Sequence, residues 1–109
     1  MDFLELNWVD AHEQVLPAAD VQRSVKYIHA AITSGKSVVV HCAQGKSRST
    51  TVVLAYVCSA MKARVTVAEG LALVKERRAM AGPNSSFMKQ LKDFEAAGLF
   101  DELRTKLAT

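Results

Sequence analysis

An uninterrupted run of β-branched residues near the middle of the chain limits its fold more than any other feature. Residues 37–41 contain three valines in succession, which is typical of a strand buried on both faces. Before this run, apolar residues recur at intervals of three and four between Pro17 and Gly35, the spacing of an amphipathic helix. Residues 3–9 are rich in aromatic and branched side chains and predict a short first strand. Strand, helix and strand in this order form a right-handed crossover between parallel strands, so the sequence predicts an α/β fold.

After the second strand the sequence predicts only helices. Residues 50–61 are apolar on nearly every face, as expected of a central buried helix. Residues 65–78 form an amphipathic helix pattern, which Thr66 and Glu69 open as a reciprocal capping pair. The remaining expected features are a loop over residues 80–86, a last helix from Phe87 and an interruption of that helix at Gly98.

Length and composition narrow the class of protein. One hundred and nine residues can build one hydrophobic core but not two, so residues 1–109 are predicted to form a single domain. The net charge of +3 comes from scattered basic residues and argues against a nucleic-acid partner. No apolar stretch reaches the roughly 20 residues of a membrane span, and the first residues do not resemble a secretory signal. Two cysteines exclude a disulfide framework and favour a reducing compartment, the cytoplasm or the nucleus.

Residues 41–49, His-Cys-Ala-Gln-Gly-Lys-Ser-Arg-Ser, carry the chemistry of the chain. Cys42 and Arg48 are joined by a loop that leaves a predicted strand and enters a predicted helix, where successive backbone N–H groups can point at one anion. Gly45 gives that loop conformations closed to other residues, and the planar Arg48 side chain can grip two phosphate oxygens at once. The predicted phosphate-binding residues are Ala43, Gln44, Gly45, Lys46, Ser47 and Arg48.

A cysteine at the bottom of such a loop becomes a nucleophile. A thiol with a pKa of about 8.5 is only about 3% ionised at pH 7, but near cations and helix N-termini the pKa can fall to about 5. A fall of about three units corresponds to about 4 kcal/mol of stabilisation of the thiolate. Attack of Cys42 on phosphorus would give a phosphocysteine that water later releases. Cys58 and Arg64 have the same spacing but no glycine between them and no strand before them, so Cys58 is interpreted as a small buried apolar residue.

The pattern His-Cys-x-x-Gly-x-Ser-Arg-Ser resembles the signature of the dual-specificity phosphatases, in the cysteine-based protein tyrosine phosphatase superfamily. Residues 74–78, 83–87 and 90–91 look like further elements of that family, with Ser86 where the family usually has glycine. The resemblance covers roughly residues 5–97. It implies a small, mostly parallel sheet flanked by helices, with fewer strands than usual because family domains begin further upstream. An uncovered sheet edge would then favour self-association or a partner.

The resemblance also implies roles for residues around the loop. The family carries an acidic proton donor on the loop after the strand that precedes the crossover helix, and Asp10 lies there, 32 residues before Cys42. Glu13 is the alternative donor, and a turn residue is the other interpretation of Asp10. Ser49 is suited to donate a hydrogen bond to the departing thiolate, or to cap the helix that follows.

Two further positions are expected to support the loop. His41 is expected to orient it through hydrogen bonds rather than to transfer protons. Asn84 resembles a family position that helps to hold the signature loop, and a helix cap is its alternative role.

The resemblance implies hydrolysis of phosphotyrosine and of phosphoserine or phosphothreonine monoesters on a phosphorylated protein, without a metal or another cofactor. A phosphoinositide, a phosphoglycan or an RNA phosphate is the alternative substrate. Lys46 is the only basic residue at the variable positions of the loop, fewer than a polyphosphorylated headgroup requires. A phosphate-binding interaction module with weak or no turnover is the alternative function.

Overall fold

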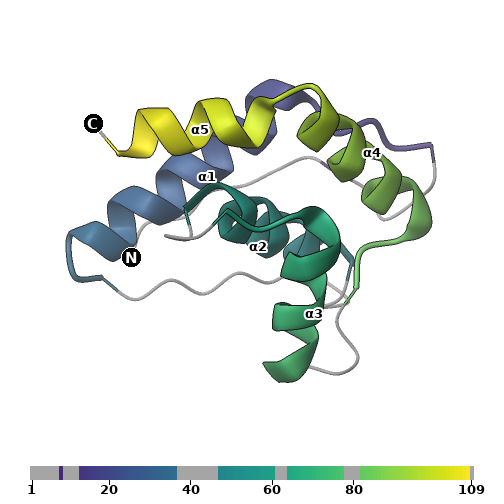
Figure 1. Cartoon of the computed structure of the whole chain (residues 1–109), viewed down its shortest axis with the longest axis horizontal. Helices are drawn as coiled ribbons and strands as arrows, with labels where there is room; N and C mark the ends of the chain where they lie inside the picture. The colour runs from purple at the N-terminus through teal and green to yellow at the C-terminus, as the bar shows by residue number, and fades with distance from the viewer. Residues whose placement is uncertain (1–7, 9–12, 37–46, 61–63, 78–81, 109) are drawn as a thin grey trace.

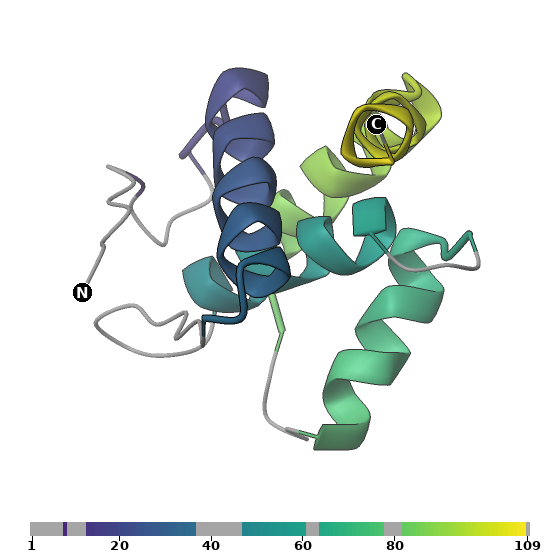
Figure 2. The ribbon, with the colours of Figure 1, turned by 90° about the vertical axis from the view of Figure 1, so that its left-hand side faces the viewer.

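The computed structural model describes residues 8, 13–36, 47–60, 64–77 and 82–108. Within these residues the chain forms five helices, shown in Figure 1: α1 (Ala18–Thr33), α2 (Ser47–Ala60), α3 (Val67–Arg77), α4 (Ser85–Ala96) and α5 (Leu99–Leu107). Helix α2 lies at the centre and contacts each of the other four helices. Helix α3 packs on α2 and α4 and extends away from α1 and α5, as Figure 2 shows.

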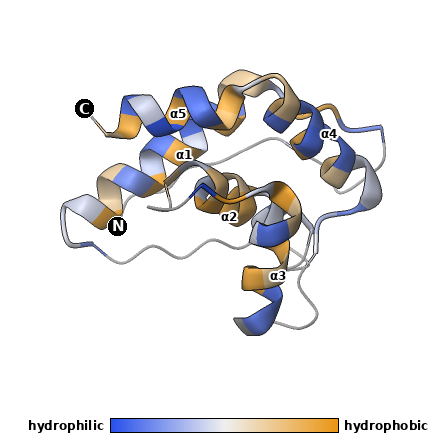
Figure 3. Ribbon diagram, in the orientation of Figure 1, coloured by the Kyte–Doolittle hydropathy of each residue, from blue (hydrophilic) through white to orange (hydrophobic). Residues whose placement is uncertain are grey.

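The central position of α2 confirms the central buried helix that the sequence predicts here, and Figure 3 shows hydrophobic residues along this helix. Two of its buried polar side chains are satisfied within the helix: the hydroxyls of Thr51 and Ser59 donate to the carbonyl oxygens of Ser47 and Ala55, at 2.7 and 2.8 Å. The helix begins at Ser47, three residues before the predicted start. The prediction followed apolar residues only, so it missed the polar first turn that directly follows the signature loop.

Side chains from all five helices form the hydrophobic core around α2, and α3 contributes one buried residue, Val67. Helix α1 contributes Val21, Val25 and Ile28, whose spacing of three and four residues gave the sequence prediction of this helix. The other buried apolar residues are Trp8, Leu16, Val52, Leu54, Ala55, Cys58, Val67, Phe87, Leu91, Leu99, Phe100 and Leu103. Full burial of one large apolar side chain contributes about 1.5–3 kcal/mol, so this core is the main source of stability for the described helices.

The ends of the helices follow the predicted signals to within a few residues. Helix α1 begins one residue after Pro17 and ends before Gly35, whose φ of +82° is a left-handed conformation that favours glycine. The capping pair at α3 is confirmed: the Thr66 N–H donates to the Glu69 carboxylate at 3.0 Å, and the Glu69 N–H donates to the Thr66 hydroxyl at 3.1 Å. Gly98, with a φ of +83°, separates α4 from α5 as expected.

Both predicted strands lie outside the described residues, apart from Trp8 in the first of them. The described part of the chain is made of helices and loops, so the parallel sheet stays a prediction here. The helix that was predicted to connect the two strands is present as α1. Among the described helices, none has the length and apolar character that crossing a membrane requires.

Candidate active site

The structure describes four of the predicted site residues: Ser47, Arg48 and Ser49 in the first turn of α2, and Asn84 before α4. The other predicted site residues lie outside the described part of the chain, namely Asp10, His41, Cys42, Ala43, Gln44, Gly45 and Lys46. The described residues therefore define the helical side of the candidate site, directly after the signature loop.

The Arg48 guanidinium is partly buried and is held by the backbone of Trp8. Its Nη1 donates to the Trp8 carbonyl oxygen at 3.0 Å, across 40 positions of sequence. Its Nε is buried and has no hydrogen-bond partner within the described residues. A guanidinium carries five N–H donors in a rigid plane, so one anchored nitrogen fixes the plane while other donors stay available. Trp8 precedes Asp10 by two residues, and this contact links the α2 N-terminus to the segment expected to carry the proton donor.

Ser47 joins the N-termini of α2 and α4. Its hydroxyl accepts a hydrogen bond from the Asn84 backbone N–H at 2.7 Å, and the Asn84 side chain accepts from the Phe87 N–H at 2.8 Å as the α4 cap. Asn84 is therefore a helix cap, the alternative interpretation from the sequence, and its backbone N–H also contacts Ser47, the first residue of α2. Ser49 lies one helical position after Arg48 and is buried. Helix N-termini carry partial positive charge, so an anion near this junction would be stabilised.

The Trp8 side chain is buried and contacts one residue of α4 and one residue of α1. That side chain is 4% exposed, and its ring meets the Phe87 ring edge-on with centroids 6.4 Å apart. Its indole N–H donates to the Asp20 carboxylate at 3.1 Å. The contact between Trp8 and Asp20 could not be predicted from spacing, because it joins residues of different segments.

Gln90 on α4 holds the segment that follows the expected acid loop. Its Oε1 accepts the Leu16 N–H at 2.7 Å, and its Nε2 donates to the Gln14 carbonyl oxygen at 2.9 Å. The same Nε2 donates to the Ser86 hydroxyl at 3.2 Å, at the position where the family usually has glycine. In the sequence, residues 90–91 resemble a family element, but no role for Gln90 follows from the resemblance. The available signal was its place three residues after Phe87, on the same face of α4.

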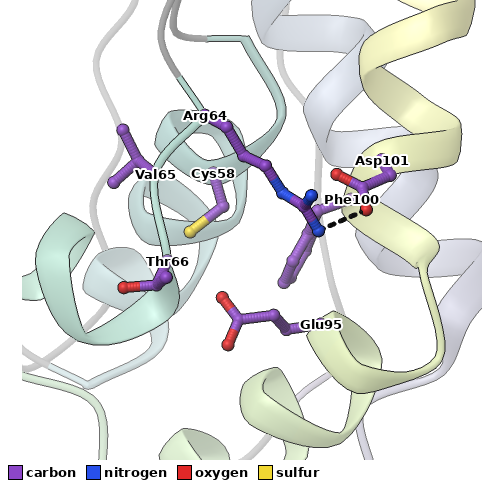
Figure 4. Close-up of a pocket in the computed structure, with 7 residues that line it drawn as sticks. All are labelled: Cys58, Arg64, Val65, Thr66, Glu95, Phe100 and Asp101. Atoms are coloured by element: carbon purple, nitrogen blue, oxygen red, sulfur yellow. Dashed lines mark hydrogen bonds and ion pairs between the residues drawn. The ribbon is translucent and has the colours of Figure 1, made fainter.

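Cys58 and Arg64, the second pair with signature spacing, do not form a comparable site. Cys58 is 1% exposed, and burial, with a further contribution from the Glu95 carboxylate, raises the pKa of its thiol to about 12. Arg64 instead makes a surface ion pair with Asp101 at 2.7 Å. Figure 4 shows both residues lining a pocket of about 240 Å³, together with Thr66, Glu95 and Phe100. The structure therefore confirms the interpretation of Cys58 as a small buried apolar residue.

Comparison with known proteins identifies the family to which this chain belongs. The family model described as "Dual specificity phosphatase, catalytic domain" matches residues 1–97, and this chain belongs to that family. Dual specificity protein phosphatase 1 of Arabidopsis thaliana is 46% identical over 71 residues, which are 65% of this chain and 35% of the relative. Dual specificity protein phosphatase 22-A of Danio rerio is 38% identical over 95 residues, which are 87% of this chain and 44% of the relative. The chain thus spans less than half the length of these two relatives.

Solved structures agree on the fold. The crystal structure of DUSP15 superposes with a TM-score of 0.86 at 30% identity, covering 96% of this chain and 65% of that one. The human tyrosine phosphatase-like serine/threonine/tyrosine-interacting protein superposes with a TM-score of 0.76 at 29% identity, covering 86% and 60% of the two chains. The fold is therefore of the dual-specificity phosphatase type.

Proposed function

We propose that this chain is a metal-independent cysteine phosphatase that hydrolyses phosphotyrosine and phosphoserine or phosphothreonine monoesters of proteins in the cytoplasm or nucleus. The observation that carries the proposal is the hydrogen bonding of the Arg48 guanidinium. Its Nη1 donates to the Trp8 carbonyl oxygen, while its buried Nε has no hydrogen-bond partner among the described residues. A buried donor without a partner costs about 1–3 kcal/mol. Binding of a phosphate oxygen at Arg48 would offset this cost, and family membership supports the reaction class.

In the first proposed step the Cys42 thiolate attacks phosphorus and the ester P–O bond breaks. The leaving oxygen takes its proton from the Asp10 carboxyl group, or from Glu13 in the alternative assignment. Arg48 and the backbone N–H groups of residues 43–48 hold the non-bridging phosphate oxygens, whose charge is redistributed in the transition state.

In the second proposed step water attacks the phosphocysteine. The P–S bond breaks, the proton of the water passes to the carboxylate left by the first step, and inorganic phosphate leaves. The thiolate that departs accepts a hydrogen bond from the Ser49 hydroxyl. His41 and Asn84 support the loop during both steps, and neither step requires a metal.

A second candidate function is a phosphate-binding module with little turnover. One observation favours it: a structure with a TM-score of 0.76 to this chain is described as a tyrosine phosphatase-like interacting protein. The sequence here retains Cys42, Arg48 and Asp10 together. Because both steps of catalysis would require these three residues, and phosphate binding alone would not require Asp10, we favour the enzyme.

The purified chain should hydrolyse a small aryl phosphate in the presence of a chelator. Cys42→Ser should abolish turnover and keep phosphate binding, because the loop and Arg48 remain. Cys58→Ser is the matched control and should keep turnover, since Cys58 is buried on the far end of α2 from Arg48. Turnover by Cys42→Ser, or loss of turnover on chelation, would contradict the mechanism. Phosphate binding without turnover in the unmodified chain would favour the binding module.

A further inference from the structure

We propose that Asp20 on α1 is a positioning residue for Arg48 and acts through Trp8. The contacts form a continuous series: the Asp20 carboxylate accepts the Trp8 indole N–H at 3.1 Å, and the Trp8 backbone carbonyl accepts Arg48 Nη1 at 3.0 Å. This inference rests on the proposed function, because it assigns to Asp20 a share in setting the affinity of Arg48 for a phosphoryl group.

The Asp20 carboxylate is itself held in place. Asp20 lies in the first turn of α1, and its backbone carbonyl accepts the buried Ser24 hydroxyl at 2.6 Å. Its two carboxylate oxygens have separate partners: Oδ2 accepts the Trp8 indole N–H, while Oδ1 meets Arg23 Nη2 at 3.5 Å. Arg23 is the more exposed side chain of this pair, and exposed ion pairs contribute little. The bond to Trp8 is therefore the contact of Asp20 that matters for the site.

Loss of the carboxylate would leave the indole N–H of a buried ring without an acceptor. An unsatisfied buried donor is costly, so the ring would shift toward another acceptor or toward solvent. The ring and the carbonyl belong to the same residue, and a shift of Trp8 therefore also moves the acceptor that fixes the Arg48 guanidinium. A guanidinium that is not fixed must lose more conformational freedom when it binds phosphate, which weakens binding.

The series of contacts can be interrupted at either end with the same predicted result. Asp20→Ala removes the acceptor, and Trp8→Phe removes the donor while it keeps an aromatic ring against Phe87. Asp20→Asn keeps an acceptor oxygen and removes the charge, so it should rescue the contact. Arg23→Gln is the matched control, because it removes the other partner of Asp20 and leaves the indole bond intact.

Two measurements that do not depend on turnover test the contacts from Asp20 through Trp8 to Arg48. Calorimetric titration with inorganic phosphate, in a Cys42→Ser background, measures the affinity of the site. Hydrogen exchange by NMR measures the protection of the Arg48 Hε and of the Trp8 indole proton, and the indole signal is unambiguous because the chain has one tryptophan. Thermal unfolding of each variant shows whether it remains folded.

Asp20→Ala and Trp8→Phe should each weaken phosphate binding about two- to tenfold, the range expected from loss of one net hydrogen bond. The double variant should bind no more weakly than the weaker single variant, since both changes interrupt one series. Asp20→Asn and Arg23→Gln should bind within about twofold of the parent. Faster exchange of the Arg48 Hε should accompany each loss of affinity.

Additive losses in the double variant would overturn the proposal, as would an Asp20→Ala variant with unchanged affinity and unchanged Arg48 exchange. A lower melting temperature in Asp20→Ala with both readouts unchanged would assign Asp20 a structural role only. If the parent itself bound no phosphate, the proposed function would fail. Exchange of the Arg48 Hε alone would then decide whether Asp20 positions Arg48.

Discussion

Replacement of Gln90 by methionine should lower the free energy of unfolding. It should also slow the hydrolysis of substrates whose leaving group needs a proton donor. Methionine has a similar length and is unbranched, so it can fill the same space, but it cannot replace the bonds to the Leu16 N–H and the Gln14 carbonyl. Leu16 is 2% exposed. Each of these two bonds contributes about 0.5–1.5 kcal/mol, so their loss should reduce the free energy of unfolding by about 1–3 kcal/mol. The third bond of Gln90, to the Ser86 hydroxyl within α4, is the longest at 3.2 Å and is left out of this sum.

Urea denaturation of the full chain measures this loss, and Lys89→Met provides the control. Lys89 is the neighbouring residue on α4, and its contact with Asp93 at 3.2 Å is an exposed ion pair. Such a pair contributes about 0.3–0.5 kcal/mol, so Lys89→Met should be nearly neutral. An equal loss in both variants would show that introducing methionine on α4, rather than removing the Gln90 carboxamide, causes the effect.

Gln90→Met also tests whether Gln90 helps to place the proton donor for catalysis. Gln90 holds residues 14–16, which follow the segment expected to carry Asp10. Gln90→Met should therefore slow hydrolysis of an alkyl or phenyl phosphate, which requires a proton donor, more than hydrolysis of an activated aryl phosphate. Equal slowing of both substrates would refute the link between Gln90 and the proton donor.

Other substitutions, and chemical modification of the cysteines, test the proposed roles of Arg48, Asp10, Cys42 and Cys58. Arg48→Lys should lose most turnover at unchanged charge, because lysine cannot grip two phosphate oxygens; near-normal kcat/KM would show that Arg48 is not the phosphate clamp. Asp10→Asn should slow hydrolysis of poor leaving groups by about 10² to 10⁴ and remove the basic limb of the pH–rate profile; if Glu13→Gln removes that limb instead, Glu13 is the donor. Iodoacetamide at pH 7 should modify Cys42 in the native chain and leave Cys58, whose pKa is raised to about 12, and peptide mass spectrometry checks this. Because folding raises the Cys58 pKa from 9.0, its contribution to stability should be complete below pH 9 and lost as the pH rises toward 12; a Cys58→Ala variant should therefore show a weaker loss of stability over that range.

Local signals in the sequence predicted the helices well. The spacing of apolar residues in α1, the capping pair of Thr66 and Glu69 and the break at Gly98 all act within a few residues, and the structure confirms each of them. Burial of Cys58 was also predicted, because it lies in a helix that is apolar on nearly all sides. The start of α2 was placed too late, since its first turn is polar.

Contacts between distant segments could not be predicted in the same way. The Gln90 carboxamide meets Leu16 across 74 positions, and Arg48 meets Trp8 across 40 positions. Each is a single polar contact that leaves no periodic pattern in the sequence. The site residues that come from the signature and the resemblance, above all Cys42 and Asp10, lie outside the described part of the chain and stay predictions.

Detection of the covalent intermediate tests the central claim most directly. The chain with Ser49→Ala should release the Cys42 thiolate more slowly, so the intermediate should accumulate while an aryl phosphate turns over. A denaturing quench followed by peptide mass spectrometry should find phosphate on the peptide that contains Cys42 and none on the peptide that contains Cys58. Continued turnover with no phosphate on the Cys42 peptide, in both the unmodified chain and the Ser49→Ala variant, would contradict the proposed mechanism.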